Sequence, residues 1–333
     1  MAAFLSILAV LALGYVAYLG GSSEGLRYLF GVVIPYAAVI VFICGFVARL
    51  VGWAKSPAPF SIATTGGQQW SFDWIKSEPL DNPPTKGWAV ARMIFEVMLF
   101  RSLFRNTSVH LHPGQKVRYN SAKWLWLFAL LFHYSFLVIF IRHFRFFLEP
   151  VPFLITAVEA LDGMFQMATP TFYQTDMVIL LGVGFLLLRR FFDNKVRYIS
   201  LMADYFPLFL ILGVVSTGIW MRYLDKTDVS NIKVLTMGLM TFHPMVPADI
   251  APIFFIHLFL VCSLLVYFPF SKLMHMGGVF MSPTRNLPNN PRFVRYVNPW
   301  NPPKKLRTYA EYEDEFREHM VEAGLPVDKQ PES

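Results

Sequence analysis

The chain has 333 residues, of which 55% are hydrophobic, 17% aromatic and only 15% charged, against about 25% charged in an ordinary soluble domain. This composition indicates a membrane protein. The two cysteines, Cys44 and Cys262, are too few for a disulfide framework, an iron–sulfur cluster or a covalently attached c-type haem. The net charge of +7 does not indicate nucleic-acid binding, because the basic residues stand at the ends of apolar segments, as membrane proteins require.

Six stretches are long and apolar enough to cross a bilayer, whose core of about 30 Å requires about 20 helical residues. They cover residues 3–20, 28–53, 122–148, 174–192, 200–222 and 251–275. The first lacks the basic start and the small-residue cleavage site of a secretory signal, so we expect it to remain as a helix. The sequence therefore predicts an all-α integral membrane protein with six transmembrane helices in a bundle, and residues 1–53 supply the first two.

Lysine and arginine predict the orientation, because cytoplasmic loops are enriched in them. Residues 49–123 contain ten, the link 189–200 contains four, and the chain from Lys272 onward contains nine, whereas residues 149–173 contain none. Both termini are therefore expected in the cytoplasm, together with the long second loop and the C-terminal tail.

The two cytoplasmic regions contain segments suited to contact. Within the loop 54–121, residues 88–104 mix a broad apolar surface with Arg92, Glu96 and Arg101, which indicates an interfacial helix lying on the membrane. The tail 278–333 begins rich in proline and asparagine and is expected to be extended.

A short terminal helix is predicted near the end of this tail. Thr308 and Glu311 form a capping box, and Gly324 with Pro326 ends the helix. Its apolar stripe consists of Tyr309, Tyr312, Phe316 and Met320. Such a stripe must cover something, either loops of this chain or a partner protein.

Four histidines lie inside predicted spans, where an imidazole is costly and normally has a partner or a function. His133 and His143 are ten residues apart in one span, and His257 and His275 are eighteen apart in another. A single such histidine is a hydrogen-bonded packing residue about as often as it is a functional one. Four of them in two helices favour a function. The two helices run in opposite directions, so we expect His143 beside His257 near the outer face and His133 beside His275 near the cytoplasm.

The two spacings correspond to rises of about 15 Å and about 27 Å along a helix. Helix tilt, the breadth of a macrocycle and a break at Pro269 are expected to absorb the difference. Two histidines from facing helices can fill both axial positions of one haem iron, which then only passes electrons. The pattern therefore predicts two b-type haems in the bundle.

Haem propionates favour arginine as a partner. Arg142, Arg145 and Arg222 are placed for the outer haem. Lys123, Arg189, Arg190 and Lys272 are placed for the inner one, although anchoring at the membrane surface explains this second group as well.

A quinone site needs apolar walls and one or two groups that bond to the carbonyls or exchange protons. The outer loops offer six candidates: Glu159, Asp162, Gln166, Tyr173, Gln174 and His243. Ordinary solvation of these loops explains their presence about equally well.

The spacings H-x9-H at His133/His143 and H-x17-H at His257/His275 resemble those of the di-haem cytochrome b membrane subunits typified by the gamma subunit of respiratory nitrate reductase. The resemblance covers residues 122–277, the four-helix di-haem domain. The additional N-terminal helix, the 54–121 insertion and the basic, proline-rich tail look more like the DsrM family, the membrane cytochromes b of the sulfite-reduction-associated complex. That family is also similar to the membrane subunit of heterodisulfide reductase.

The resemblance implies electron transfer between menaquinol and a cytoplasmic iron–sulfur subunit of heterodisulfide-reductase type (DsrK-like), in dissimilatory sulfur or sulfate respiration. It also implies further membrane and periplasmic redox subunits and a place in the bacterial inner membrane. A subunit of a nitrate reductase or heterodisulfide reductase is an alternative within this class. A proton-relaying transporter and a structural anchor for a soluble subunit are alternatives from other classes. The transporter is disfavoured because three of the six spans lack charges at depth and no inverted repeat is visible.

Overall fold

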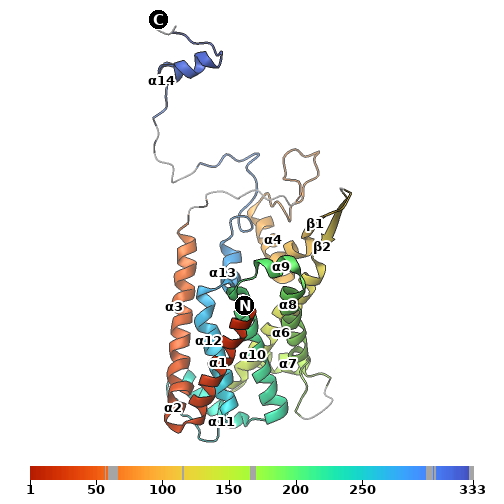
Figure 1. Ribbon diagram of the computed structural model, residues 1–333, viewed down its shortest axis with the longest axis vertical. Helices are drawn as coiled ribbons and strands as arrows, with labels where there is room; N and C mark the ends of the chain where they lie inside the picture. The colour runs from red at the N-terminus through yellow and green to blue at the C-terminus, as the bar shows by residue number, and fades with distance from the viewer. Residues whose placement is uncertain are drawn as a thin grey trace. The chain divides into compact units, whose positions relative to one another are not determined.

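The computed structural model describes residues 1–56, 58, 67–114, 116–165, 170–297, 303 and 305–329. It divides into two compact units, residues 1–293 and 294–333. The larger helices of the first unit are α1 (Ala2–Ser22), α3 (Ile34–Ala54), α4 (Lys86–Leu99), α6 (Lys123–His143), α7 (Phe153–Asp162), α8 (Gln174–Phe192), α10 (Met202–Ile219), α11 (Val229–Met240) and α12 (Pro252–Tyr267). Shorter helices are α2 (Glu24–Tyr28), α5 (Arg101–Arg105), α9 (Asn194–Ile199) and α13 (His275–Gly278). Figure 1 shows this order along the chain.

Five continuous helical segments among the described residues are long and apolar enough to cross a membrane: Ala2–Ser22, Glu24–Ala54, Lys123–Phe146, Met202–Asp225 and Pro252–Phe270. The chain is thus a multi-pass, all-α membrane protein, as its composition predicted. The remaining expected span, residues 174–192, is present as helix α8. Charged residues stand near both of its ends, Asp176 at the N-terminal end and Arg189 with Arg190 at the C-terminal end. The count of six spans stays a prediction.

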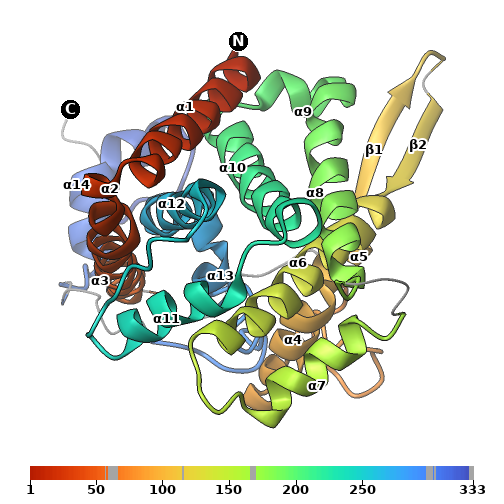
Figure 2. The ribbon, with the colours of Figure 1, turned by 90° about the horizontal axis from the view of Figure 1, so that it is seen from below.

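Helix α12 lies among α1, α3 and α10, as the view in Figure 2 shows. Its side chain Phe255 is fully buried and lies against Gly21 of α1, where an added Cβ would be 2.7 Å from the Cβ of Phe255. Small residues that let helices approach closely are typical of packing in membranes, where the lipid removes the hydrophobic driving force. The first helix is therefore an integral member of the bundle.

Helices α6 and α8 form a second close contact (Figure 2). Gly182 of α8 faces the backbone of Phe132, whose Cα would lie 3.0 Å from an added Cβ. Helix α8 also contacts α10. These contacts connect α6 to the rest of the bundle through α8 and α10.

The span expected at 251–275 ends early. Helix α12 stops at Tyr267, and 3₁₀ turns at Phe268–Phe270 and Lys272–Met274 flank Ser271, which is extended. Pro269 has no N–H for the helical ladder and its ring opposes the preceding turn. The expected break at Pro269 is confirmed, and His275 begins the separate short helix α13.

The loop between α3 and α6 contains more structure than expected. The predicted interfacial helix is split into α4 and α5 by Phe100, which adopts the left-handed conformation with φ 48°. An antiparallel hairpin of β1 (Thr107–His112) and β2 (Lys116–Ser121) follows. The sequence predicts only a loop here, because two strands of six residues give a weak alternating pattern.

The second unit contains α14 (Tyr309–Glu322). The predicted capping box between Thr308 and Glu311 is confirmed, and Gly324 follows the helix with φ 70°. Glu313 is 1% exposed, because its carboxylate accepts hydrogen bonds from the backbone N–H groups of Asp328 and Lys329, both 2.8 Å long. These two bonds, the largest influences that favour its charged form, lower the pKa of Glu313. Met320 of the predicted stripe is buried within this unit.

Candidate functional site

Where the C-terminal end of α6 lies beside the N-terminal half of α12, two imidazole rings are neighbours. The centroids of His143 and His257 are 6.4 Å apart, and their planes differ by only 13°. The Nδ1 atom of His143 lies 2.7 Å from the carbonyl oxygen of Ile139, one turn earlier. The Nδ1 atom of His257 lies 2.9 Å from the hydroxyl of Thr217 on α10.

A second pair involves the middle of α6. The ring centroids of His133 and His275 are 6.0 Å apart, and their planes cross at 83°. The Nδ1 atom of His133 lies 2.7 Å from the carbonyl of Ala129, and that of His275 lies 2.8 Å from the carbonyl of Lys272. His275 reaches this position on α13, after the break at Pro269.

These contacts determine which ring nitrogen carries the proton. A carbonyl oxygen only accepts, so Nδ1 must donate in three of the histidines. The Thr217 hydroxyl can donate to the carbonyl of Gly213, 2.8 Å away, and can therefore accept from Nδ1 of His257. In these three neutral rings the Nε2 atom keeps its lone pair, as a metal-binding imidazole requires, and the Thr217 contact allows the same tautomer in His257.

The ring separations fit an iron held between two imidazoles. Such an iron lies about 2 Å from each ligating nitrogen, and each nitrogen lies about 1 Å from its ring centroid, so centroids about 6 Å apart are expected. In the part of the chain that the structure describes, no group of three or more His, Cys, Asp or Glu side chains could hold a metal ion. An ion at either pair would need the equatorial ligands of a macrocycle such as haem.

Arg142, next to His143, is 7% exposed and lies between two carboxylates. Its Nη2 donates to Asp176 at 2.8 Å, and its Nε lies 3.1 Å from Asp162. Tyr223 also donates to Asp176, at 2.8 Å, and Asp162 accepts from the backbone and hydroxyl of Thr175. Arg142 thus already pairs with two carboxylates of the protein, and its expected role as a partner of haem propionates stays a prediction.

Arg145 and Arg222, the other two arginines expected to bind propionates of the outer haem, also have partners in the protein. The guanidinium carbons of Arg142 and Arg222 lie 3.7 Å and 4.0 Å from the ring centroid of Tyr173. Arg222 donates to the carbonyl of Thr171 at 2.8 Å, and Arg145, which is 39% exposed, pairs with Glu159. These two arginines are less fully paired with carboxylates than Arg142.

Three of the six quinone-site candidates, Glu159, Asp162 and Tyr173, form part of this network. The Tyr173 hydroxyl donates to Glu159, and burial followed by this bond raises the pKa of Tyr173. Gln174 is the first residue of α8. His243 lies elsewhere in an exposed loop, with Nδ1 2.7 Å from the carbonyl of Thr241, and Gln166 lies outside the described residues. Sequence reasoning missed Asp176, Thr217 and Tyr223, because their roles depend on contacts between distant segments.

Two of the cations expected at the inner haem meet one carboxylate. Lys272 donates to Asp204 at 2.7 Å, and Arg190 lies 3.8 Å from the same side chain. Lys123 lies over the ring of Phe104, and Arg189 approaches Asp193 at 4.0 Å. Each therefore has a partner within the protein.

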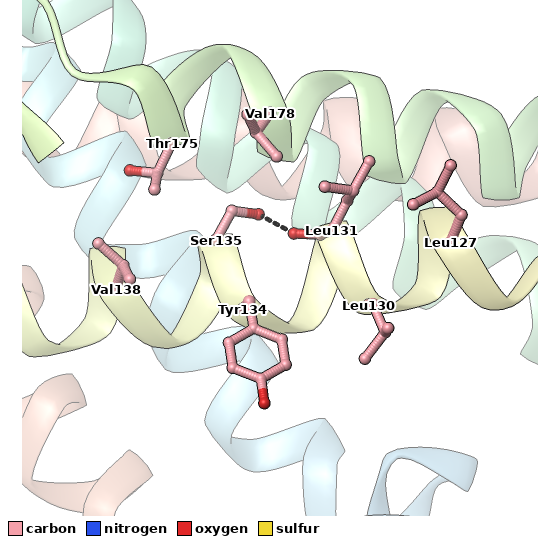
Figure 3. A pocket seen from close by; sticks show the side chains of 8 residues that line it. All are labelled: Leu127, Leu130, Leu131, Tyr134, Ser135, Val138, Thr175 and Val178. Atoms are coloured by element: carbon pink, nitrogen blue, oxygen red, sulfur yellow. Dashed lines mark hydrogen bonds between the residues drawn. The ribbon is translucent and has the colours of Figure 1, made fainter. Parts of the chain in front are cut away.

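A groove of about 340 Å³ runs between α6 and α8. Figure 3 shows its lining: Leu127, Leu130, Leu131, Tyr134, Ser135 and Val138 of α6, with Thr175 and Val178 of α8. Its hydroxyl groups are bonded internally, since Ser135 donates to Leu131 at 2.6 Å and Tyr134 donates to Met98 at 2.8 Å. The walls of the groove are therefore apolar. Thr175, which lines the groove, donates a hydrogen bond to Asp162, and Asp162 in turn pairs with Arg142.

Together, the bundle and the crossed histidine pairs define a cytochrome b-like membrane protein. The profile of the nitrate reductase gamma subunit family matches residues 99–296, and the chain belongs to this family. It is 46% identical over 281 residues to the Hdr-like menaquinol oxidoreductase cytochrome b-like subunit of Archaeoglobus fulgidus, covering 82% of this chain and 84% of that protein. The protein of the same name from Archaeoglobus profundus is 43% identical over 280 residues, covering 82% and 83%.

A more distant relative is the respiratory nitrate reductase 1 gamma chain of Escherichia coli. It is 27% identical over 188 residues, covering 50% of this chain and 83% of that protein. The similarity to the two archaeal proteins covers 82% of this chain, whereas the similarity to the nitrate reductase subunit covers 50% of it.

Proposed function

We propose that this chain is the membrane cytochrome b subunit of a menaquinol oxidoreductase complex, carrying electrons between menaquinol and a cytoplasmic iron–sulfur subunit. The observation that carries the proposal is the two pairs of neighbouring imidazoles, one at the C-terminal end of α6 and one at its middle, with centroids 6.4 and 6.0 Å apart. The names of the archaeal relatives support the substrate.

The four histidines would hold two b-type haems, His143 with His257 on the outer side and His133 with His275 on the inner side. When bound there, haem would supply one-electron transfer. The backbone carbonyls and Thr217 orient the rings and hold the proton on Nδ1. Arg145 and Arg222 remain proposed propionate partners of the outer group, whereas Arg142 stabilises the network behind it.

Menaquinol is proposed to bind at the outer end, with its isoprenoid tail along the apolar groove of Figure 3. Glu159 is the proposed proton acceptor. Its side chain is 21% exposed, and among the described residues its contacts with Arg145 and Tyr173 both go to Oε1. The Oε2 atom is therefore available to take a proton and release it outside.

The wider assembly is proposed from the resemblance and from the relatives' names. The cytoplasmic partner is of heterodisulfide-reductase type (DsrK-like), and further membrane and periplasmic redox subunits complete a complex of sulfur or sulfate respiration. The proposed location is the inner (cytoplasmic) membrane, with both termini in the cytoplasm. A nitrate reductase or heterodisulfide reductase complex would use the same electron path with a different soluble partner.

The decisive experiment is a dithionite-reduced minus oxidised spectrum of the purified protein, with haem counted as the pyridine haemochrome. We expect about two b-type haems per chain, falling by half in His143→Ala and in His275→Ala. A gently purified wild-type protein without haem would reject the cytochrome assignment and favour the transporter alternative. Retention of both haems in His275→Ala would instead reject that ligand.

A further inference from the structure

The short helix α13, which begins with His275, cannot hold its own position. It has four residues, and so short a helix is not stable without packing against other parts of the protein. Two 3₁₀ turns and the extended Ser271 separate it from α12, so α12 does not fix its place directly. The position of His275 therefore depends on what residues 268–278 pack against.

Helix α3 provides a support before His275. The ring of Phe42 stands edge-on to the ring of Phe268, with centroids 5.6 Å apart. Pro269 is fully buried and lies against Gly45, where an added Cβ would be 2.7 Å from the Cβ and 3.0 Å from the Cγ of the proline. The proline thus approaches α3 at a position where the helix has no side chain.

The same helix supports the segment again after His275. An added Cβ at Gly277 would lie 2.9 Å from a methyl carbon of Leu50, and one at Gly278 would lie 3.5 Å from the ring of Trp53. Gly277 itself is buried. Helix α3 therefore contacts the chain on both sides of the histidine.

One polar contact also reaches this segment, from α10. Lys272 donates to Asp204 at 2.7 Å, but the lysine side chain is 72% exposed, and ion pairs with so much solvent access contribute little to stability. A proline ring packed against a helix resists displacement more strongly, because close-packed interiors leave no space to move into. The contact with α3 is therefore the stronger constraint on His275.

We propose that α3 sets the orientation of the His275 ring, with Gly45 as the positioning residue that admits Pro269. The inference rests on the proposed function, in which His275 is an axial ligand of the inner haem. A methyl group at position 45 would displace the proline ring, and the backbone would move with it because the ring is bonded to the backbone at both N and Cα. Helix α3 lies outside residues 99–296, which the family profile matches, so a segment beyond the shared domain would control a ligand within it.

The test is the low-temperature EPR spectrum of the oxidised protein, with haem counted per chain, in wild type, Gly45→Ala and Gly52→Ala. Gly52 is the matched control, because it lies on the same helix and an added Cβ there meets nothing within 4 Å. The planes of His133 and His275 cross at 83°, and rotation away from the perpendicular lowers the largest g value of a ferric haem with two imidazole ligands. Gly45→Ala should shift the inner-haem signal to lower g or remove it, with the outer signal unchanged, and Gly52→Ala should change neither.

A second pair of variants applies if Gly45→Ala does not fold. In Gly277→Ala the added methyl group meets the flexible end of Leu50, so a smaller shift of the inner signal is expected. Adding Leu50→Ala to this variant removes the contact and should return the signal to its wild-type position. No shift in Gly277→Ala, or a shift that Leu50→Ala does not reverse, would overturn the inference.

The outcomes separate the inference from the proposed function. Wild-type protein without haem rejects the proposed function itself. Two haems with an unchanged inner signal in Gly45→Ala reject the inference alone, as does an equal shift in Gly52→Ala. A shift of the inner signal in Asp204→Asn but not in Gly45→Ala would assign the positioning of His275 to the Lys272 contact and would also overturn the inference.

Discussion

The imidazole planes of His133 and His275 stand nearly perpendicular, at 83°, whereas those of His143 and His257 are within 13° of parallel. Each ring is held in its orientation by the hydrogen bond of its Nδ1 atom. Parallel axial rings split the iron d orbitals along one in-plane direction, and perpendicular rings leave them nearly degenerate. The two pairs would therefore impose different ligand fields on otherwise identical haems.

We accordingly predict two distinct low-spin ferric signals in the low-temperature EPR spectrum of the oxidised protein. The His133/His275 haem should give a strongly anisotropic signal with a large principal g value, and the His143/His257 haem a rhombic one. His275→Ala should remove the first signal and His257→Ala the second. Two rhombic signals in the wild type would contradict the ring geometry of the inner pair.

Thr217 is predicted to control the outer haem without touching it. Thr217→Val keeps the shape of the side chain but removes the acceptor for Nδ1 of His257, and loss of such a partner typically costs 10- to 100-fold in metal affinity. Haem retention during dilution should fall by about this factor at the outer pair. Thr217→Ser, which keeps the hydroxyl, should behave as wild type, and equal retention in both variants would refute the prediction.

Substitution of Arg142 is predicted to lower the free energy of unfolding far more than substitution of Arg145. Arg142→Met leaves Asp162 and Asp176 buried without their shared cation, which typically costs about 3–5 kcal/mol. Arg145→Met breaks a half-exposed pair, and such pairs contribute about 0–1 kcal/mol. Denaturant unfolding of the two variants in detergent compares them directly, and similar midpoints would show that the network around Arg142 is not a major source of stability.

The hydrogen bonds that the Glu313 carboxylate accepts in the terminal unit are predicted to weaken in acid. Its pKa in the folded state lies below the ordinary value of 4.5, so its stabilising contribution is present above that pH and is lost as the pH falls through the folded value. Hydrogen-exchange protection factors of residues 309–322 should therefore decrease on acidification below about 4.5. Glu313→Gln should be less protected at neutral pH and should respond less to acid.

Local patterns predicted the elements whose signals lie within a few residues. Apolar length indicated the five long helices, Pro269 indicated the break after α12, and Thr308 with Glu311 indicated the cap of α14. Membership of the nitrate reductase gamma subunit family also agrees with the resemblance carried by the histidine spacing. The assignment of the histidines as haem ligands stays a prediction.

Long-range partners could not be predicted in the same way. The carboxylates around Arg142 come from α7 and α8, 20 and 34 residues further along the chain, and no local pattern connects them. The contacts of Glu96 with Arg285 and Ser102 are equally distant along the chain or set by a loop, and no periodic pattern indicates them. The hairpin after α5 was missed because the pairing of short strands depends on their partner more than on their own sequence.

The break at Pro269 also separates His257 from His275 mechanically. His257 belongs to a membrane-spanning helix, but His275 belongs to α13, which continues into residues held by the long loop, where Asn289 bonds to Pro83 and Gln69. A soluble subunit docked on that loop would touch the stretch of chain that positions the inner ligand. The exit point for electrons would then be aligned by the act of docking, while the outer ligand stays fixed in the bundle.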